Sequence, residues 1–83
     1  MLEIREIEEY KGVLEYLHKR GLVEQFAKVK RQILEGYLDL ADFKKRQPKA
    51  LGQWYFRINR QYRAIGYLDG DRFTVVSIDD HHQ

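Results

Sequence analysis

The hydrophobic period changes once along this chain, and that change constrains the fold class more than any other feature. Between residues 7 and 37, apolar side chains recur about every 3.6 residues, as on one face of an amphipathic helix. From Gln53 onward apolar and polar side chains alternate, which is typical of half-buried strands. Neither half can bury its apolar face alone, so helices and sheet must cover one another. We therefore expect an α+β fold.

Two helices are expected in the first half, after a short opening strand or frayed helix start that includes Leu2 and Ile4. Gly21 separates two apolar stripes and favours a helix end, so the helices should form an antiparallel hairpin. We expect the tyrosines of both stripes, like Tyr16, to pack in the core or between the helices. The stripes comprise Ile7, Tyr10, Val13, Leu14 and Leu17, and then Val23, Phe26, Ala27, Ile33, Leu34 and Tyr37.

Three strands are expected in the second half, joined as an antiparallel meander. Residues 59–61 fit a three-residue turn, and Asp69 with Gly70 fit a second turn. The element order is thus β-α-α-β-β-β, with an antiparallel sheet covered on one face by the N-terminal helix hairpin. Alternation assigns six side chains to the covered face: Trp54, Phe56, Ile58, Ala64, Val76 and Ile78.

The length and the apolar runs indicate what kind of protein this is. The 83 residues are expected to form a single domain, residues 1–83. The apolar runs are only a few residues long, and the acidic N-terminus is unlike a signal peptide. We expect a cytoplasmic protein with no membrane partner. The absence of cysteine excludes a thiolate metal site and a cysteine nucleophile.

Basic residues are concentrated in one segment. The chain has 15 Lys and Arg against 13 Asp and Glu, and this net charge of +2 does not by itself indicate a nucleic-acid partner. Residues 43–63, however, contain no acid. This segment is either a phosphate-binding surface or a solvated loop with ordinary strand edges. Its basic residues are Lys44, Lys45, Arg46, Lys49, Arg57, Arg60 and Arg63.

Two of these arginines should face each other across the first hairpin. With a turn at residues 59–61, Arg57 lies opposite Arg63, with Cβ atoms roughly 4.5–5.5 Å apart. Two guanidinium groups at that distance repel each other. A phosphate held between them would relieve the repulsion, because arginine binds phosphate with paired hydrogen bonds. Alternatively, each arginine pairs with a nearby acid such as Asp79 or Asp80.

The C-terminus adds a candidate proton-transfer group to this face. Alternation places His81 on the face of Asp79, and His82 on the opposite face, so the Asp-Asp-His-His run cannot surround one metal ion. A histidine beside two arginines is suited to act as a general acid or base. Tyr55 and Tyr67 share the face of the arginines, where they either stack on bases or are ordinary strand residues.

The motifs of the second half resemble a known family. The run WYFRINRQYRAIGY, a DG turn and VVSIDDHH are similar to the RelE/ParE superfamily of toxins from bacterial toxin–antitoxin systems, especially its HigB and YoeB branches. The motifs cover residues 51–82, and residues 1–50 agree in element order and length. The resemblance implies a compact fold like that of microbial RNases. It also implies an enzyme that enters the ribosomal A site and cuts mRNA without a metal or other cofactor.

The resemblance also implies roles for individual residues. Arg63 corresponds to the arginine that contacts the scissile phosphate, Arg57 to the basic residue of the preceding strand, and His81 to the terminal catalytic histidine. Asp42 is the acid nearest to the position of the YoeB glutamate, and is therefore the candidate general base. The expected RNA- and ribosome-binding residues are Lys44, Lys45, Arg46, Lys49, Tyr55, Arg60 and Tyr67.

The implied partners are the 70S ribosome, mRNA and a cognate antitoxin. An acidic or amphipathic antitoxin segment should cover the basic face, because it supplies complementary charge. Two other functions remain open at this point. One is a ParE-like toxin that binds and inhibits DNA gyrase without cutting RNA. The other is a catalytically silent protein-binding domain.

Overall fold

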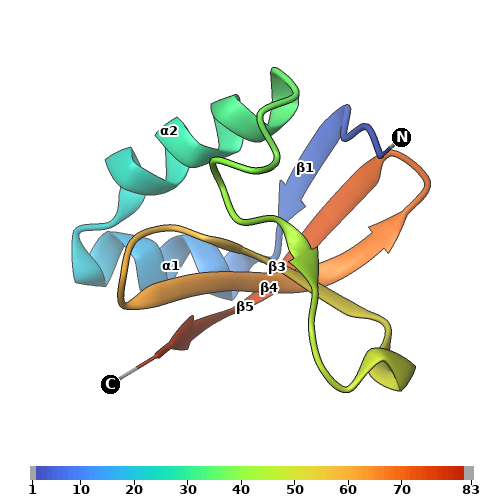
Figure 1. Cartoon of the computed structure of the whole chain (residues 1–83). Coiled ribbons are helices and arrows are strands. Elements are labelled where there is room, and N and C mark those ends of the chain that lie inside the picture. Colours follow the sequence, from blue (N-terminus) through green and yellow to red (C-terminus); the bar gives the residue numbers. More distant parts are fainter. Residues whose placement is uncertain (1, 82–83) are drawn as a thin grey trace.

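A computed structural model describes residues 2–81, in which two α-helices pack on a five-stranded sheet (Figure 1). The strand order across the sheet is β1-β5-β4-β3-β2. The expected α+β class and element order are confirmed, with one added two-residue strand. In chain order the elements are β1 (Glu6–Glu9), α1 (Lys11–Arg20), α2 (Val23–Leu34), β2 (Lys44–Lys45), the 3-10 helix η1 (Lys49–Leu51), β3 (Gln53–Arg57), β4 (Tyr62–Asp69) and β5 (Arg72–Asp80).

The sheet is mixed rather than antiparallel throughout. β3, β4 and β5 form the expected antiparallel meander, and β2 extends it at the β3 edge. β1 pairs in parallel with β5, with Ile7 opposite Phe73. The helix hairpin and the loop after it carry the chain from one edge of the sheet to the other. β2 was not expected because two consecutive lysines show no strand alternation.

The core lies between the helix hairpin and one face of the sheet. α1 ends at Gly21, whose φ of 68° lies in the left-handed region that glycine adopts without strain. Among residues 2–81, no helix is long and apolar enough to cross a membrane. Buried side chains come from both helices and from four strands: Val13, Leu17, Phe26, Ile33, Ile7, Phe56, Ala64, Phe73 and Val75.

The first helix begins later than its apolar stripe indicated. The chain stays extended through Tyr10, whose N–H donates to the Val75 carbonyl at 3.0 Å, and the helix starts at Lys11. Ile7 is therefore buried as a strand residue, and Tyr10 is 59% exposed. Tyr37 lies beyond the end of α2 and is also exposed, so the prediction that both tyrosines pack in the core or between the helices was wrong. Tyr16 is half-buried and packs edge-on against Tyr62, as expected. Four other stripe residues, Leu14, Val23, Ala27 and Leu34, are also exposed.

A bulge in β5 shifts the expected core pattern. Ile65 lies opposite Ser77, whereas Gly66 lies opposite Val75, so Val76 has no partner in β4. Val75 is fully buried and Val76 is not, contrary to the prediction. A Cβ atom on Gly66 would lie 1.9 Å from the carbonyl oxygen of Thr74. Glycine is required here because the β5 backbone approaches so closely.

Candidate active site

The sheet face opposite the helix hairpin, called the open face below, carries the predicted polar residues. The turn after β3 closes as expected, with the Ile58 N–H donating to the Tyr62 carbonyl at 2.9 Å. Arg57 consequently pairs in register with Arg63, and Arg63 pairs with Asp79 on β5. Three charged side chains thus lie in one row across three adjacent strands.

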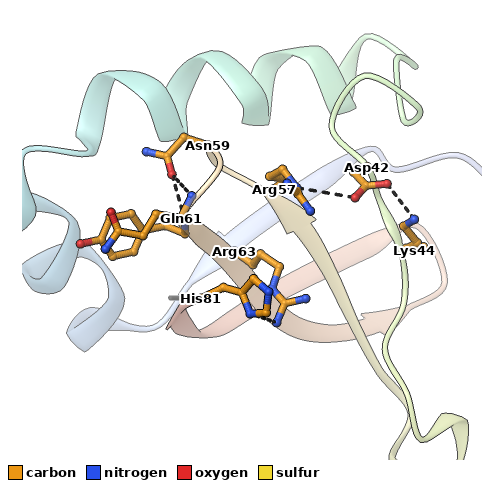
Figure 2. Close-up of polar contacts among 8 residues, drawn as sticks. Asp42, Lys44, Arg57, Asn59, Gln61, Arg63 and His81 are labelled. Atoms are coloured by element: carbon orange, nitrogen blue, oxygen red, sulfur yellow. Dashed lines mark hydrogen bonds and ion pairs between the residues drawn. The ribbon is translucent and has the colours of Figure 1, made fainter. Parts of the chain in front are cut away.

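Asn59 fixes the turn that sets this register. Its Oδ1 accepts from the backbone N–H groups of Gln61 and Tyr62, both at 2.9 Å (Figure 2). Its Nδ2 donates to Gln25 on α2 at 2.8 Å, which ties the turn to the helix layer. Arg60 is exposed at the tip of this turn, outside the charged row, and forms no polar side-chain contact with residues 2–81.

Arg63 lies at the centre of the open face and contacts three residues. Its Nη2 donates to Asp79 Oδ2 at 2.7 Å and lies 3.4 Å from His81 Nδ1. Its Cζ lies 5.0 Å from the centroid of the Tyr55 ring. The side chain is only 19% exposed, and within residues 2–81 its buried Nε has no hydrogen-bond partner. The structure therefore brings together Arg63, His81 and Tyr55, as the sequence predicted.

Arg57 is more exposed and more loosely held. Its Nε lies 3.7 Å from Asp42 Oδ2, beyond hydrogen-bond distance. The other oxygen of Asp42 accepts from Lys44 Nζ at 2.9 Å. This hydrogen bond, together with the attraction between the two charges, raises the pKa of Lys44. Figure 2 shows this group beside the Arg63–His81 pair.

Asp42 owes its position to an unusual backbone conformation. Its φ is 55°, in the left-handed region, and its N–H donates to the Asp39 carbonyl at 3.1 Å. The adjacent Ala41 carbonyl accepts the Arg57 N–H at 2.8 Å. The loop before β2 is thereby fastened to β3, and the Asp42 carboxylate lies near the arginine pair.

Each arginine therefore has its own carboxylate in the free protein. Asp79 pairs with Arg63, as one of the two alternatives anticipated, and Asp42 pairs with Arg57, which was not anticipated. Asp80 instead accepts from Gln61 Nε2 at 2.8 Å. A phosphate would have to compete with carboxylates rather than enter an unpaired cation site.

His81 extends the open face just beyond β5. Its backbone N–H donates to the Gln61 carbonyl at 2.6 Å, which continues the pairing with the β4 side. A guanidinium group cannot accept a hydrogen bond. A hydrogen bond from Arg63 to Nδ1 therefore requires the tautomer of His81 whose proton is on Nε2. His82 lies outside the described residues, so its predicted orientation is not tested.

The remaining predicted RNA-binding residues do not form one patch. Lys44 lies opposite Tyr55 and next to Asp42, whereas Lys45 lies opposite Trp54, on the other side of the sheet. Lys49 is exposed on η1, in a loop that projects away from the sheet (Figure 1).

Arg46 and Tyr67 are linked through a residue that the sequence analysis missed. Arg46 Nη1 donates to Gln53 Oε1 at 3.0 Å, and Gln53 Nε2 donates to the Tyr67 hydroxyl at 3.2 Å. Gln53 could have been found from its alternation with Tyr55.

The open face is better suited to an extended ligand than to a small molecule. One hollow of about 300 Å³ lies away from this face, bordered by Leu2, Ile4, Leu34 and Leu38. Small-molecule sites are normally concave, whereas a row of cations and aromatic rings on a sheet suits a nucleic-acid strand. In residues 2–81, no group of three or more His, Asp and Glu side chains is placed to hold a metal ion.

Several solved structures share this fold, although no protein-family model and no curated protein sequence matches the chain. The YoeB–YefM toxin–antitoxin complex of Staphylococcus aureus contains a chain that is 18% identical, with 99% of both chains covered and a TM-score of 0.64. A YoeB/ParE toxin from Agrobacterium tumefaciens is 16% identical, covering 93% of this chain and 99% of that one, with a TM-score of 0.66. YafQ from E. coli strain BL21(DE3) is 12% identical, covering 92% of both chains, with a TM-score of 0.67.

These similarities extend over nearly the whole chain, including the N-terminal half, where the sequence motifs were absent. They confirm that the chain has the fold of the RelE/YoeB-type toxins. At such low identity they establish the fold alone. Function must therefore be argued from the residues of the open face.

Proposed function

We propose that this protein is the toxin of a type II toxin–antitoxin pair and acts as a ribosome-dependent mRNA endoribonuclease. The observation that carries the proposal is the Arg57–Arg63 pair beside His81 on the open face. This arrangement supplies two cations for a phosphate and one group for proton transfer. The shared fold of the YoeB and YafQ toxins supports the same conclusion.

The proposed reaction is attack of a ribose 2′-hydroxyl on the adjacent phosphate. The 2′-oxygen–phosphorus bond forms, and the bond from phosphorus to the 5′-oxygen breaks. His81 donates a proton to the leaving 5′-oxygen, and both arginines stabilise the additional negative charge. Asp42 is the candidate base for the 2′-hydroxyl proton, although its carboxylate must first loosen its contact with Lys44. The proposed mechanism uses neither a metal nor another cofactor.

The proposed partners follow from the chemistry of the open face. Tyr55 and Tyr67 would stack on mRNA bases, and Lys44 and Arg46 would contact phosphates of mRNA or rRNA. Lys45, Lys49 and Arg60 lie outside the charged row and would contact rRNA rather than the scissile phosphate. The toxin would act in the cytoplasm, where ribosomes are present.

An antitoxin is proposed as the second kind of partner. One structural neighbour is a YoeB–YefM toxin–antitoxin complex. For the present chain, we propose an antitoxin with an acidic or amphipathic segment that covers the open face and neutralises its cations.

The proposal is tested by induced expression with and without the neighbouring open reading frame, followed by mapping of mRNA ends. We expect growth arrest with cleavage within translated codons, and rescue by the neighbouring gene. Arrest without mRNA cleavage, together with inhibition of purified DNA gyrase, would instead establish the ParE-like function. The absence of arrest, cleavage and gyrase inhibition would contradict toxin activity and favour a silent binding domain.

A further inference from the structure

Asp79 and His81 both contact the same atom of Arg63. Nη2 of Arg63 donates to Asp79 Oδ2 at 2.7 Å and lies 3.4 Å from His81 Nδ1. The two residues are separated by one position on the same face of β5, so their side chains point the same way. Arg63 therefore stands between a carboxylate and an imidazole that would otherwise be neighbours.

This arrangement does not suit His81 as an acid. A protonated imidazole carries a hydrogen on both ring nitrogens, so its Nδ1–H would point at the Arg63 guanidinium, which has only donors. In the free protein, Arg63 thus offers no acceptor for an Nδ1–H. A general acid must instead be the imidazolium, stabilised by an acceptor at Nδ1 and free to donate from Nε2.

A bound anion can replace the present hydrogen-bond partner of the Arg63 guanidinium. Its pairing with Asp79 uses one carboxylate oxygen, and its Nε–H has no partner among residues 2–81. A phosphate offers several oxygens and can engage two donors of one guanidinium. Arg57 lies directly across the hairpin. Its one ion pair with residues 2–81 is the 3.7 Å contact to Asp42, so it can bind the same anion.

We propose that a phosphate drawn between Arg57 and Arg63 releases Asp79, which then accepts a hydrogen bond from His81 Nδ1. Asp79 is thus a positioning residue that exchanges Arg63 for His81 when substrate binds. His81 takes up one proton from solvent and becomes an imidazolium paired with Asp79. Donation from Nε2 to the leaving oxygen returns it to the neutral Nδ1–H form. The inference rests on the anion-binding role proposed above.

The exchange explains how phosphate binding can supply the acceptor that a protonated His81 needs at Nδ1. The other groups near His81 do not provide the same pairing, because Asp80 lies on the opposite face and bonds to Gln61. The charged and titratable groups around His81 are Arg63 on β4, Asp79 and Asp80 on β5, and Arg57 and Tyr55 on β3.

The test is NMR titration of the purified full chain with inorganic phosphate, against sodium chloride at matched ionic strength. His18 on α1 is an internal reference, and the His82→Gln variant resolves the His81 signals. Phosphate should shift the ring ¹⁵N resonances of His81, because an acceptor carboxylate then faces Nδ1, and should leave those of His18 unchanged. The neutral tautomer of His81 should also change from Nε2–H to Nδ1–H.

Asp79→Asn and Asp80→Asn form a matched pair, since both remove one negative charge from adjacent positions on opposite faces. The phosphate-induced change in the His81 ring ¹⁵N resonances should be at least halved in Asp79→Asn and unchanged in Asp80→Asn. Equal behaviour of the two variants would overturn the exchange, as would wild-type His81 that keeps its Nε2–H tautomer with phosphate bound. The tautomer measurement does not require Asp79→Asn, so it stands even if that variant fails to fold.

The Arg63 Nε–H resonance separates this inference from the proposed function. If phosphate shifts that resonance and Asp79 has no effect on His81, the exchange is wrong and the anion site stands. If phosphate shifts neither the Arg63 resonance nor the ring resonances of His81, both the exchange and the proposed function are contradicted.

Discussion

The two arginines of the open face show how a sheet tolerates like charges in register. Asp79 lies directly opposite Arg63 on β5, and Asp42 approaches Arg57 from the loop before β2. Alternation and turn length predicted the arginine pair and offered Asp79 as one of its partners. Asp42 could not be paired from sequence, because alternation does not predict its left-handed backbone or the hydrogen bond from Arg57 to Ala41 that fastens its loop to β3.

His81→Gln should slow cleavage without weakening binding. We expect single-turnover mRNA cleavage on programmed ribosomes to fall by about 10²–10⁴-fold, the usual range for loss of a general acid. Ribosome affinity, measured by cosedimentation, should change less than about threefold, because glutamine keeps the polar surface. His18→Gln is the matched control, since His18 is exposed on α1, and it should retain full activity. Equal rates for the two variants would remove His81 from the mechanism.

Among the elements, β5 departs most from its sequence pattern. Strict alternation assigns Val76 to the core, but the bulge opposite Gly66 transfers that place to Val75. The same bulge leaves Ser77, Asp79 and His81 on the open face, so the expected face of His81 was correct. A glycine within a strand is a recognised sign of a bulge or a close backbone approach, but sequence alone does not show which neighbouring strand carries the extra residue.

Gly66→Ala should strongly destabilise the fold, because the new Cβ would overlap the Thr74 carbonyl oxygen. We expect a loss of about 3 kcal/mol in the free energy of unfolding, measured by urea denaturation. Gly12→Ala is the control, since no atom lies within 4 Å of its added Cβ and it is helical. That change should stabilise the protein by about 0.5–1 kcal/mol. Similar unfolding midpoints for the two variants would show that the strands are not held so closely.

The helices were predictable in number and hairpin order, but their ends were not. Their buried residues Val13, Leu17, Phe26 and Ile33 follow the expected period. Tyr10 continued the same period, yet its backbone pairs with Val75 and holds it in an extended conformation. Tertiary pairing therefore overrode the local pattern.

On the scale of the whole molecule, one sheet face is buried and the other carries the candidate chemistry. The net charge of +2 does not reveal this division, because some carboxylates pair with the cations of the open face. An acidic partner must replace those internal pairs. We expect such a partner to contact several cations of the open face at once rather than a single arginine.

A co-expressed antitoxin should therefore form a stable complex in which the open face is covered. We expect its binding segment to fold on contact, and Tyr55, Arg57 and Arg63 to lose solvent accessibility in hydrogen exchange and chemical labelling. The complex should neither bind ribosomes nor cleave mRNA. A complex that cleaves at the rate of free toxin would place the antitoxin elsewhere on the molecule.

The most direct test of the account compares Arg63→Ala with Arg60→Ala in single-turnover cleavage on programmed ribosomes. The two arginines are three residues apart, but Arg63 lies in the charged row and Arg60 lies at the turn tip. We predict that Arg63→Ala loses about 10²–10³-fold in rate, as expected for loss of a group that stabilises developing charge. Arg57→Ala should lose less, and Arg60→Ala should stay within about threefold, with circular dichroism confirming that all three are folded. Full activity of folded Arg63→Ala, or an equal loss in Arg60→Ala, would contradict the assignment of the open face as the site of RNA cleavage.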